Sequence, residues 1–186
     1  MMDTVSFYHV RMFYSFSTLA APLKHGDEIL VQNMNVRVVP FAMRYYDDVL
    51  ALWRRCEGVG LSEDDSRSHT EAYLDRNPGM SFIAMAGDMV VGAVLAGHDG
   101  RRAYIHHLAV APAYRRQGVA RQLVDRCLVA LADVGIRKCH LLVFNSNTKG
   151  IAFWKAMGWT LRSDVGILSK TIEAVSGDPC QSDAHQ

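Results

Sequence analysis

The chain has 186 residues, of which 49% are hydrophobic and 21% are charged, and its formal net charge is +1. This length and composition are typical of a single globular domain with a sizeable core. A near-neutral charge and the lack of a long apolar run argue against nucleic acid and membranes as partners.

Three parts of the chain differ in character. Residues 1–33 only loosely imitate a signal peptide, and a strand-like segment begins directly after Met34. We expect residues 1–33 to be an extension outside the domain, either the result of a start codon placed too far upstream or a disordered segment. Residues 34–173 hold the predicted elements, and residues 174–186 are polar enough to form a flexible tail.

The first elements are predicted from hydrophobic periodicity. Residues 35–39 alternate weakly and end at a proline, as a short strand does. Apolar residues at helical spacing predict a helix over 44–57, which ends where Gly58 and Gly60 follow. A second short helix is expected over 66–76.

Three β-like runs come next, at 81–86, 89–96 and 103–110. The first two are separated by Gly87 and Asp88, which is a two-residue hairpin signal. Because these connections are too short for a crossover, we expect the three strands to be antiparallel.

A basic turn follows the third run. Pro112 ends the apolar segment, Arg115 and Arg116 follow, and Gly118 precedes an amphipathic helical pattern over 119–134. Helix N-termini present unpaired N–H groups and a partial positive charge, and arginines add charge-assisted hydrogen bonds. The turn therefore suits a pyrophosphate, although an ordinary turn with a solvated basic surface remains the alternative.

The last elements surround a second candidate motif. Residues 138–144 predict a strand that is entered by a helical crossover and is therefore parallel to the strand before it. Asn147 can cap a helix that runs to Met157. Residues 159–172 are expected to hold one or two final strands.

Two motifs and the order of the elements resemble the GNAT acetyltransferase superfamily. Arg115-x-x-Gly118-x-Ala120 resembles its acyl-CoA pyrophosphate loop, and the segment from Asn147 to Trp159 resembles a second family signature. The resemblance covers about residues 34–173. It implies an α/β (α+β) fold with a mixed central sheet of about six or seven strands, flanked by about four helices.

The resemblance also implies a binding site for CoA. In the family, the strand before the loop bonds the pantetheine arm through its backbone, here at Leu108 and Val110, and diverges from the next parallel strand. Asn147 would contact the same arm, although a helix N-cap is its alternative role. The residues implied to bind CoA are Leu108, Val110, Arg115, Arg116, Gln117, Gly118, Val119, Ala120, Asn147 and Trp154.

One residue departs from the family pattern and puts in doubt how the CoA thiolate is protonated. Trp154 stands where many members have a tyrosine that protonates the CoA thiolate, and an indole N–H has no useful acidity. We expect Tyr104 or water to protonate the thiolate instead.

His106 is the candidate base, at a position where similar arylalkylamine acetyltransferases place a catalytic histidine. Strand alternation puts Tyr104 and His106 on one face and His107 on the other. A histidine that is merely packed or solvent-exposed is the alternative for His106. For the acidic residues of 57–65 we prefer a solvated loop to a site that attracts amines; these residues are Glu57, Glu63, Asp64 and Asp65.

The implied function is transfer of an acetyl group from acetyl-CoA to an amine by direct attack in a ternary complex. The acceptor would be an amine-bearing small molecule or protein, and a homodimer is compatible with the family. The alternatives are a non-catalytic acyl-CoA-binding or sensing module, which Trp154 favours, and a phosphate binder of another fold.

The cysteines and histidines show no spacing that is typical of a metal site. Three of the four cysteines lie in apolar helical or strand patterns, so we expect reduced thiols, in a cytoplasmic protein without a bound metal. The cysteines are Cys56, Cys127, Cys139 and Cys180.

Overall fold

The structure is a computed structural model, and it describes residues 36–172. The predictions for residues 1–33 and 174–186 lie outside the described residues. Within that range the strands are β1 (Val36–Pro40), β2 (Phe82–Ala86), β3 (Met89–His98), β4 (Ala103–Val110) and β5 (Cys139–Leu141). The α-helices are α1 (Tyr46–Arg55), α2 (Arg67–Arg76), α3 (Val119–Asp133) and α4 (Thr148–Ala156), with single 3-10 turns at η1 (Met43–Tyr45), η2 (Glu63–Asp65) and η3 (Pro112–Tyr114).

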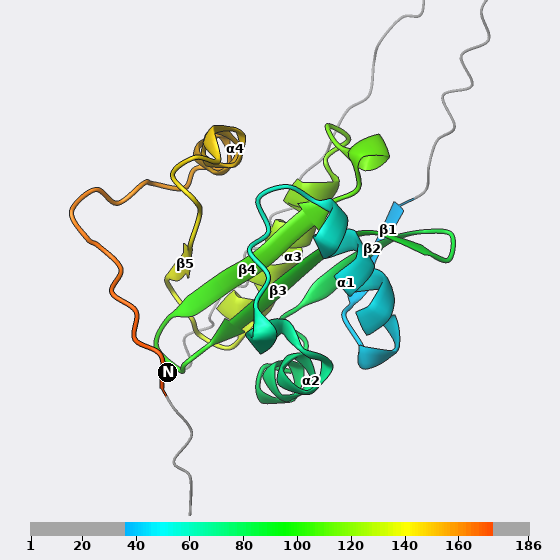
Figure 1. The fold of residues 1–186 in the computed structure, drawn as a ribbon, viewed down its shortest axis with the longest axis horizontal. Helices are drawn as coiled ribbons and strands as arrows, with labels where there is room; N and C mark the ends of the chain where they lie inside the picture. Colours follow the sequence, from blue (N-terminus) through cyan, green and yellow to red (C-terminus); the bar gives the residue numbers. More distant parts are fainter. Residues whose placement is uncertain (1–35, 173–186) are drawn as a thin grey trace, which may run out of the picture. The chain divides into compact units, whose positions relative to one another are not determined.

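The five strands form one mixed sheet in the order β1-β2-β3-β4-β5 (Figure 1). The pairings β1–β2, β2–β3 and β3–β4 are antiparallel, while β4 and β5 are parallel. The predicted antiparallel strands and the helical crossover through α3 are therefore confirmed, and so are the mixed sheet and its four flanking helices.

The described sheet has fewer strands than expected at its C-terminal end. The strand predicted over 138–144 is paired with β4 at three positions only, and residues 159–172 contain no strand. Leu142 and Phe144 beyond β5 are 62% and 59% exposed. A further strand needs a backbone edge to pair with, and a three-residue β5 offers very little of one.

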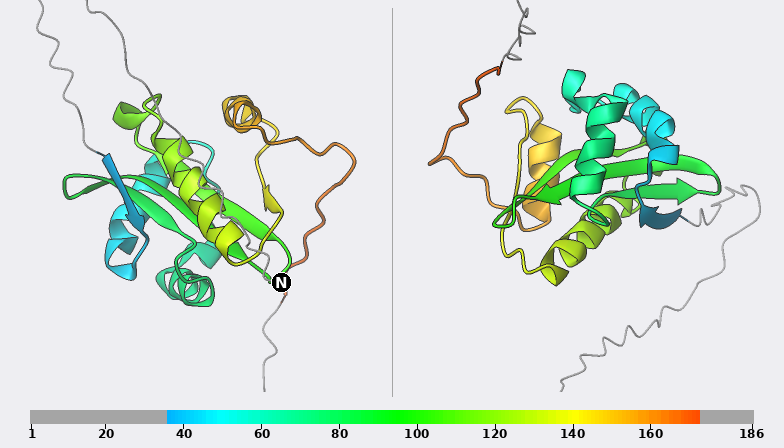
Figure 2. Two further views of the ribbon diagram at one scale, coloured as in Figure 1. Left: turned by 180° about the vertical axis from the view of Figure 1, so that it is seen from behind. Right: turned by 90° about the horizontal axis from the view of Figure 1, so that it is seen from below.

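The helices cover the two faces of the sheet in separate layers. Helices α1 and α2 lie on one face and α3 lies on the other (Figure 2). Trp53 of α1 packs with Ile83 and Met85 on the first face, whereas Leu123 of α3 packs with Val94 on the second. Each such side chain, when fully buried, contributes roughly 1.5–3 kcal/mol to stability.

One glycine sets how closely α3 approaches the sheet. A Cβ at Gly92 of β3 would lie 3.0 Å from Leu123 Cδ1 and 3.3 Å from Val119 Cγ1. The absence of a side chain therefore lets the first turns of α3 rest directly on β3. This contact positions the N-terminus of α3 beside the end of β4.

Candidate active site

The second half of β4 has an open edge. Its pairing with β5 ends at Ile105, five residues before the strand itself ends. The N–H of Ala111 donates to Val91 O across 2.8 Å, so the backbone groups of Val110 and Leu108 point the other way, toward that edge. This half of β4 pairs with no strand on the β5 side within the described residues, and Val110 O there accepts the Nε–H of Arg115.

The basic turn leads from this edge into α3. Arg116 and Gly118 both adopt left-handed backbone conformations, with φ of 64° and 81°. Gly118 is the N-cap of α3, and no side chain caps the helix there. The first N–H groups of α3 are thus left for an external acceptor or water.

The side chains of the turn divide into two groups. Arg115 folds back, since its Nε donates to Val110 O at 2.9 Å, and the amide of Gln117 donates to Ala113 O at 2.9 Å. Arg116 extends from an exposed position. Val119 is buried and Ala120 is partly buried against the α3-side core, so these two could reach a ligand only through their backbone.

A bulge in β4 changes which residues share a face. Ala109 pairs with Ala93 and His106 pairs with Leu95, so His107 and Leu108 together oppose a single residue of β3. His107 has φ of 50°, and its ring lies 5.0 Å from that of Trp53 on the α1 side. The prediction that His107 lies on the opposite face from His106 is wrong, because the extra residue shifts the alternation by one.

His106 lies among aromatic rings on the α2 side of β4. Its ring centroid is 6.0 Å from that of Tyr73 and 6.2 Å from that of Tyr104, which stacks on it. Burial lowers the pKa of His106 below its ordinary value, His107 lowers it further, and Asp65 opposes the shift. The imidazole is therefore neutral near pH 7 and can accept a proton.

An ion pair between Asp65 and His107 was not predicted from the sequence. The His107 Nε2 and Asp65 Oδ1 atoms are 2.5 Å apart, and the two side chains are 17% and 12% exposed. Asp65 is therefore not the solvated charge that we expected, whereas Glu57, Glu63 and Asp64 are exposed. The spacing Ser62-x-x-Asp65 was an available signal, since it forms a capping box in which Asp65 Oδ2 accepts the Ser62 N–H.

The connector between α1 and α2, residues 56–66, crosses β4 toward the loop that follows β5 (Figure 1). A Cβ at Gly58 would lie 2.6 Å from Asn147 Nδ2, and one at Gly60 would lie 2.9 Å from Phe144 Cζ. Asn147 caps α4, because its Oδ1 accepts the N–H of Gly150 at 2.9 Å. The two glycines thus allow the connector to approach the open side of β4 closely.

Trp154 has an aromatic environment. Its ring centroid lies 5.1 Å from that of Phe153 and 5.0 Å from that of Trp159, and the side chain packs against the α3-side core. Its indole N–H has no useful acidity, so Trp154 cannot act as a general acid.

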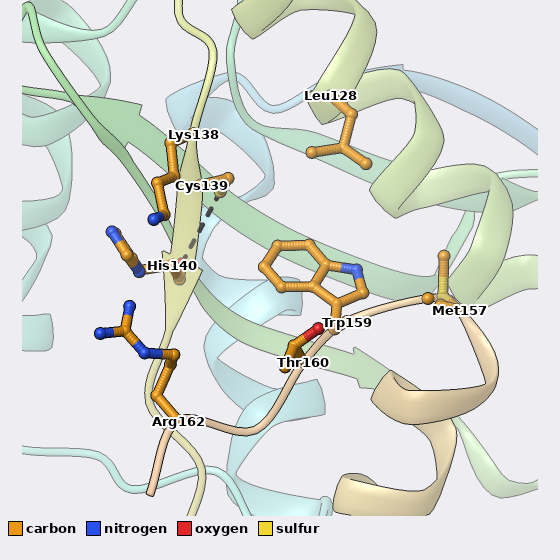
Figure 3. Close-up of a pocket in the computed structure, with 9 residues that line it drawn as sticks. Leu128, Lys138, Cys139, His140, Met157, Trp159, Thr160 and Arg162 are labelled. Atoms are coloured by element: carbon orange, nitrogen blue, oxygen red, sulfur yellow. Dashed lines mark hydrogen bonds between the residues drawn. The ribbon is translucent and has the colours of Figure 1, made fainter. Parts of the chain in front are cut away.

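A cavity of about 490 Å³ lies along β5, away from the basic turn (Figure 3). The indole of Trp159 is near Leu128 and Met157, with the basic side chains of Lys138, His140 and Arg162 on the other side of β5. Since none of the predicted CoA or catalytic residues lines this cavity, it is not part of the candidate site. Its lining residues are Leu128, Lys138, Cys139, His140, Met157, Gly158, Trp159, Thr160 and Arg162.

Two further findings concern the described residues. No helix within residues 36–172 is long and apolar enough to cross a membrane. The same range holds no group of three histidine, cysteine or acidic side chains arranged to bind a metal ion.

Comparison with known proteins gives one family. The sequence model of the acetyltransferase (GNAT) family matches residues 46–159. An acetyltransferase of Sodalis glossinidius is 29% identical over 75% of this chain and 96% of its own length. An acetyltransferase of Pectobacterium atrosepticum is 27% identical over 75% of this chain and 97% of its own length.

Solved structures share the fold at lower identity. Aminoglycoside N-acetyltransferase AAC(6')-Iy in complex with CoA superposes with a TM-score of 0.63 at 19% identity, over 77% of this chain and all of that one. An aminoglycoside acetyltransferase from a soil metagenome, in complex with sisomicin, gives a TM-score of 0.60 at 16% identity, over 77% and 99%. The family match covers more than half of the chain, and the fold agrees with it. The chain belongs to the acetyltransferase (GNAT) family.

Proposed function

We propose that this protein transfers an acetyl group from acetyl-CoA to an amine. The observation that carries the proposal is the open edge of β4, which runs directly into the uncapped, basic N-terminus of α3. A strand edge that pairs with no other strand suits the amides of a pantetheine arm, and the helix N-terminus suits a pyrophosphate. AAC(6')-Iy, which shares the fold, was solved in complex with CoA, and this supports the assignment.

In this proposal CoA contacts the residues that the sequence named. The arm pairs with the backbone of Leu108 and Val110, and the pyrophosphate lies on the N–H groups from Gln117 to Ala120. Arg116 adds the charge that is free to move, while Arg115 supports the turn through Val110. Asn147 and Trp154 form the wall across the open edge.

The chemistry is a direct attack in a ternary complex. The neutral amine nitrogen attacks the thioester carbonyl carbon, a C–N bond forms, and the C–S bond breaks to release the CoA thiolate. His106 accepts the proton that the amine loses, and Tyr104 or water protonates the thiolate. Backbone N–H groups at the edge of β4 polarise the carbonyl, and fixed orientation supplies much of the rate.

The acceptor in this proposal is an amine-bearing small molecule. The metagenomic acetyltransferase was solved with sisomicin and AAC(6')-Iy with a bisubstrate analogue of CoA and acetylneamine, so this fold binds such amines in other proteins. A protein amine is the second acceptor class, and a homodimer in the cytoplasm belongs to the same proposal.

The test is release of free CoA thiol from acetyl-CoA with a panel of amines. The panel holds an arylalkylamine, a polyamine, an aminoglycoside, free amino acids and peptides with free N-termini or lysines. We expect turnover with at least one small amine and none with the matching alcohols. CoA binding without any turnover would favour the sensing module, for which the tryptophan at position 154 is the specific argument.

A further inference from the structure

The ion pair between Asp65 and His107 joins two segments that are 42 residues apart in the sequence. One is the short turn η2 in the α1–α2 connector, and the other is the bulge in β4. Neither residue belongs to the predicted CoA site or to the predicted catalytic pair. Both side chains are largely buried, so solvent screens this pair less than it screens an ion pair on the surface.

Asp65 is held in place from several directions. Its Oδ2 accepts the Ser62 N–H at 2.8 Å, while its backbone carbonyl accepts the Tyr46 hydroxyl at 2.8 Å and the Thr70 hydroxyl at 3.4 Å. With the backbone and one carboxylate oxygen fixed, Oδ1 has a single direction in which to point. That direction is toward Nε2 of His107.

His107 occupies a backbone conformation that histidine seldom adopts. Its φ of 50° lies in the left-handed region, where the backbone of residues other than glycine is strained. Such a conformation persists when the surroundings hold it, and here Asp65 and the Trp53 ring do so. The bulge also brings the ring of His107 to 6.3 Å from that of His106.

The titratable groups that face His106 come from three elements. Tyr73 belongs to α2, Tyr104 and His107 to β4, and Asp65 to η2. Burial raises the pKa of Tyr73, so that phenol stays neutral near pH 7. The two members of the Asp65–His107 pair act on the pKa of His106 in opposite directions, since His107 lowers it and Asp65 raises it.

We propose that His107, held by Asp65, is a positioning residue for the transfer reaction. It fixes the bulge that sets the His106 ring on the connector side of β4, and its own ring lies 6.3 Å from that ring. The pair also ties the connector to β4. This inference rests on the proposed function, in which His106 accepts the proton of the amine.

The first experiment follows the His106 ring by NMR during a pH titration and needs no turnover. The variants are His107→Asn, which tolerates a left-handed backbone, and His107→Gln, which can still donate to Asp65. Either change removes the His107 imidazole, which lowers the pKa of His106, and leaves the Asp65 carboxylate, which raises it, so the pKa of His106 should rise by about half a pH unit or more. His106→Gln assigns the signal.

A double variant is the matched control. Asp65→Asn combined with His107→Asn removes both opposing influences, so the pKa of His106 should return close to that of the unchanged protein. An unchanged His106 titration in both single variants, with folding intact by circular dichroism, overturns the effect of His107 on His106. A pKa that falls in the single variants overturns it as well.

Activity then separates positioning from catalysis. With the best amine, the acid limb of kcat/KM should move to higher pH in His107→Asn, while the KM for acetyl-CoA stays within about twofold. Complete loss of the acid limb in His107→Asn would indicate that His107 itself is the base, and this would overturn the proposal. If no amine is acetylated by the unchanged protein, the proposed function fails, but the NMR titration still decides the role of His107.

Discussion

Single residues decide the chemistry of the site. His106 combines a partly buried ring, the aromatic neighbours Tyr73 and Tyr104 and a pKa lowered by burial, so its imidazole is neutral near pH 7. Arg115 and Arg116 are adjacent and both exposed, but Arg115 bonds back to Val110 O, whereas the Arg116 side chain makes no hydrogen bond with the described residues.

A substitution at His106 tests the base. His106→Gln should lower kcat/KM by roughly 10²- to 10⁴-fold and should abolish its acid limb. In the unchanged protein the base must be deprotonated, so the rate falls as pH drops through the His106 pKa, which lies below 6.5. A pH–rate profile checks this, with His98→Gln as a control that should keep the limb. A retained limb in His106→Gln would exclude His106 as the base.

A substitution at Arg116 tests the anion site. Arg116→Ala should weaken CoA binding by roughly 10- to 100-fold, because a charge-assisted hydrogen bond contributes about 1.5–3 kcal/mol. Calorimetry at two salt concentrations should also show a smaller salt dependence. The control Arg137→Ala removes the same charge from an exposed position beyond the C-terminus of α3. Equal CoA affinity in both variants would argue against a pyrophosphate at the turn.

At the scale of elements, the site is assembled where three connections meet. The connector crosses β4, the turn after β4 begins α3, and the loop after β5 ends at Asn147, which caps α4. The parallel β5 stops after three paired residues, and this short strand leaves the edge of β4 open. The chemistry thus depends on where elements end rather than on the elements themselves.

Gly58 tests the connector. It has φ of 85°, and a Cβ there would lie 2.6 Å from Asn147 Nδ2, so Gly58→Ala meets both backbone strain and a clash. Gly79 has φ of 74° and nothing within 4 Å, so Gly79→Ala meets the strain alone. Gly79→Ala should lose about 1–2 kcal/mol of unfolding free energy in urea, and Gly58→Ala should lose at least as much. Only Gly58→Ala should change the KM for CoA or amine, and equal kinetics in the two variants would remove the connector from the site.

At the scale of the whole molecule, two cores hold the sheet between its helix layers. The α3-side core continues to Trp154 and Trp159, whereas the α1-side core includes Trp53 beneath His107. Cys127 and Cys139 lie in or against the α3-side core, and burial raises their pKa values to about 12 and about 11. These thiols are therefore protonated near neutral pH and are poor nucleophiles, which agrees with direct transfer.

Ligand binding should be visible in the stability of this whole unit. CoA at about 100 times its Kd should add about 2.7 kcal/mol, which corresponds to a rise in Tm of about 5–10 °C. Differential scanning fluorimetry measures the shift. ATP at the same concentration should shift the Tm much less, because it lacks the arm that pairs with β4. Equal shifts would indicate a general phosphate site.

The local predictions from the sequence were confirmed where one residue type has one physical consequence. Pro112 and Gly118 mark the turn between β4 and α3, Asn147 caps α4, and the short connections make β2, β3 and β4 antiparallel. These features depend on backbone conformation and on neighbours within a few residues.

The sequence by itself determined the family, the order of the elements and the basic turn, because hydrophobic periodicity and turn residues are local signals. Only the tertiary structure decided that His107 shares a face with His106, that Asp65 is buried against it, and that β5 ends early. Those outcomes depend on one bulged residue in β4 and on contacts between segments far apart in the chain. Periodicity assumes regular pairing, so it carries no information about where the pairing slips or stops.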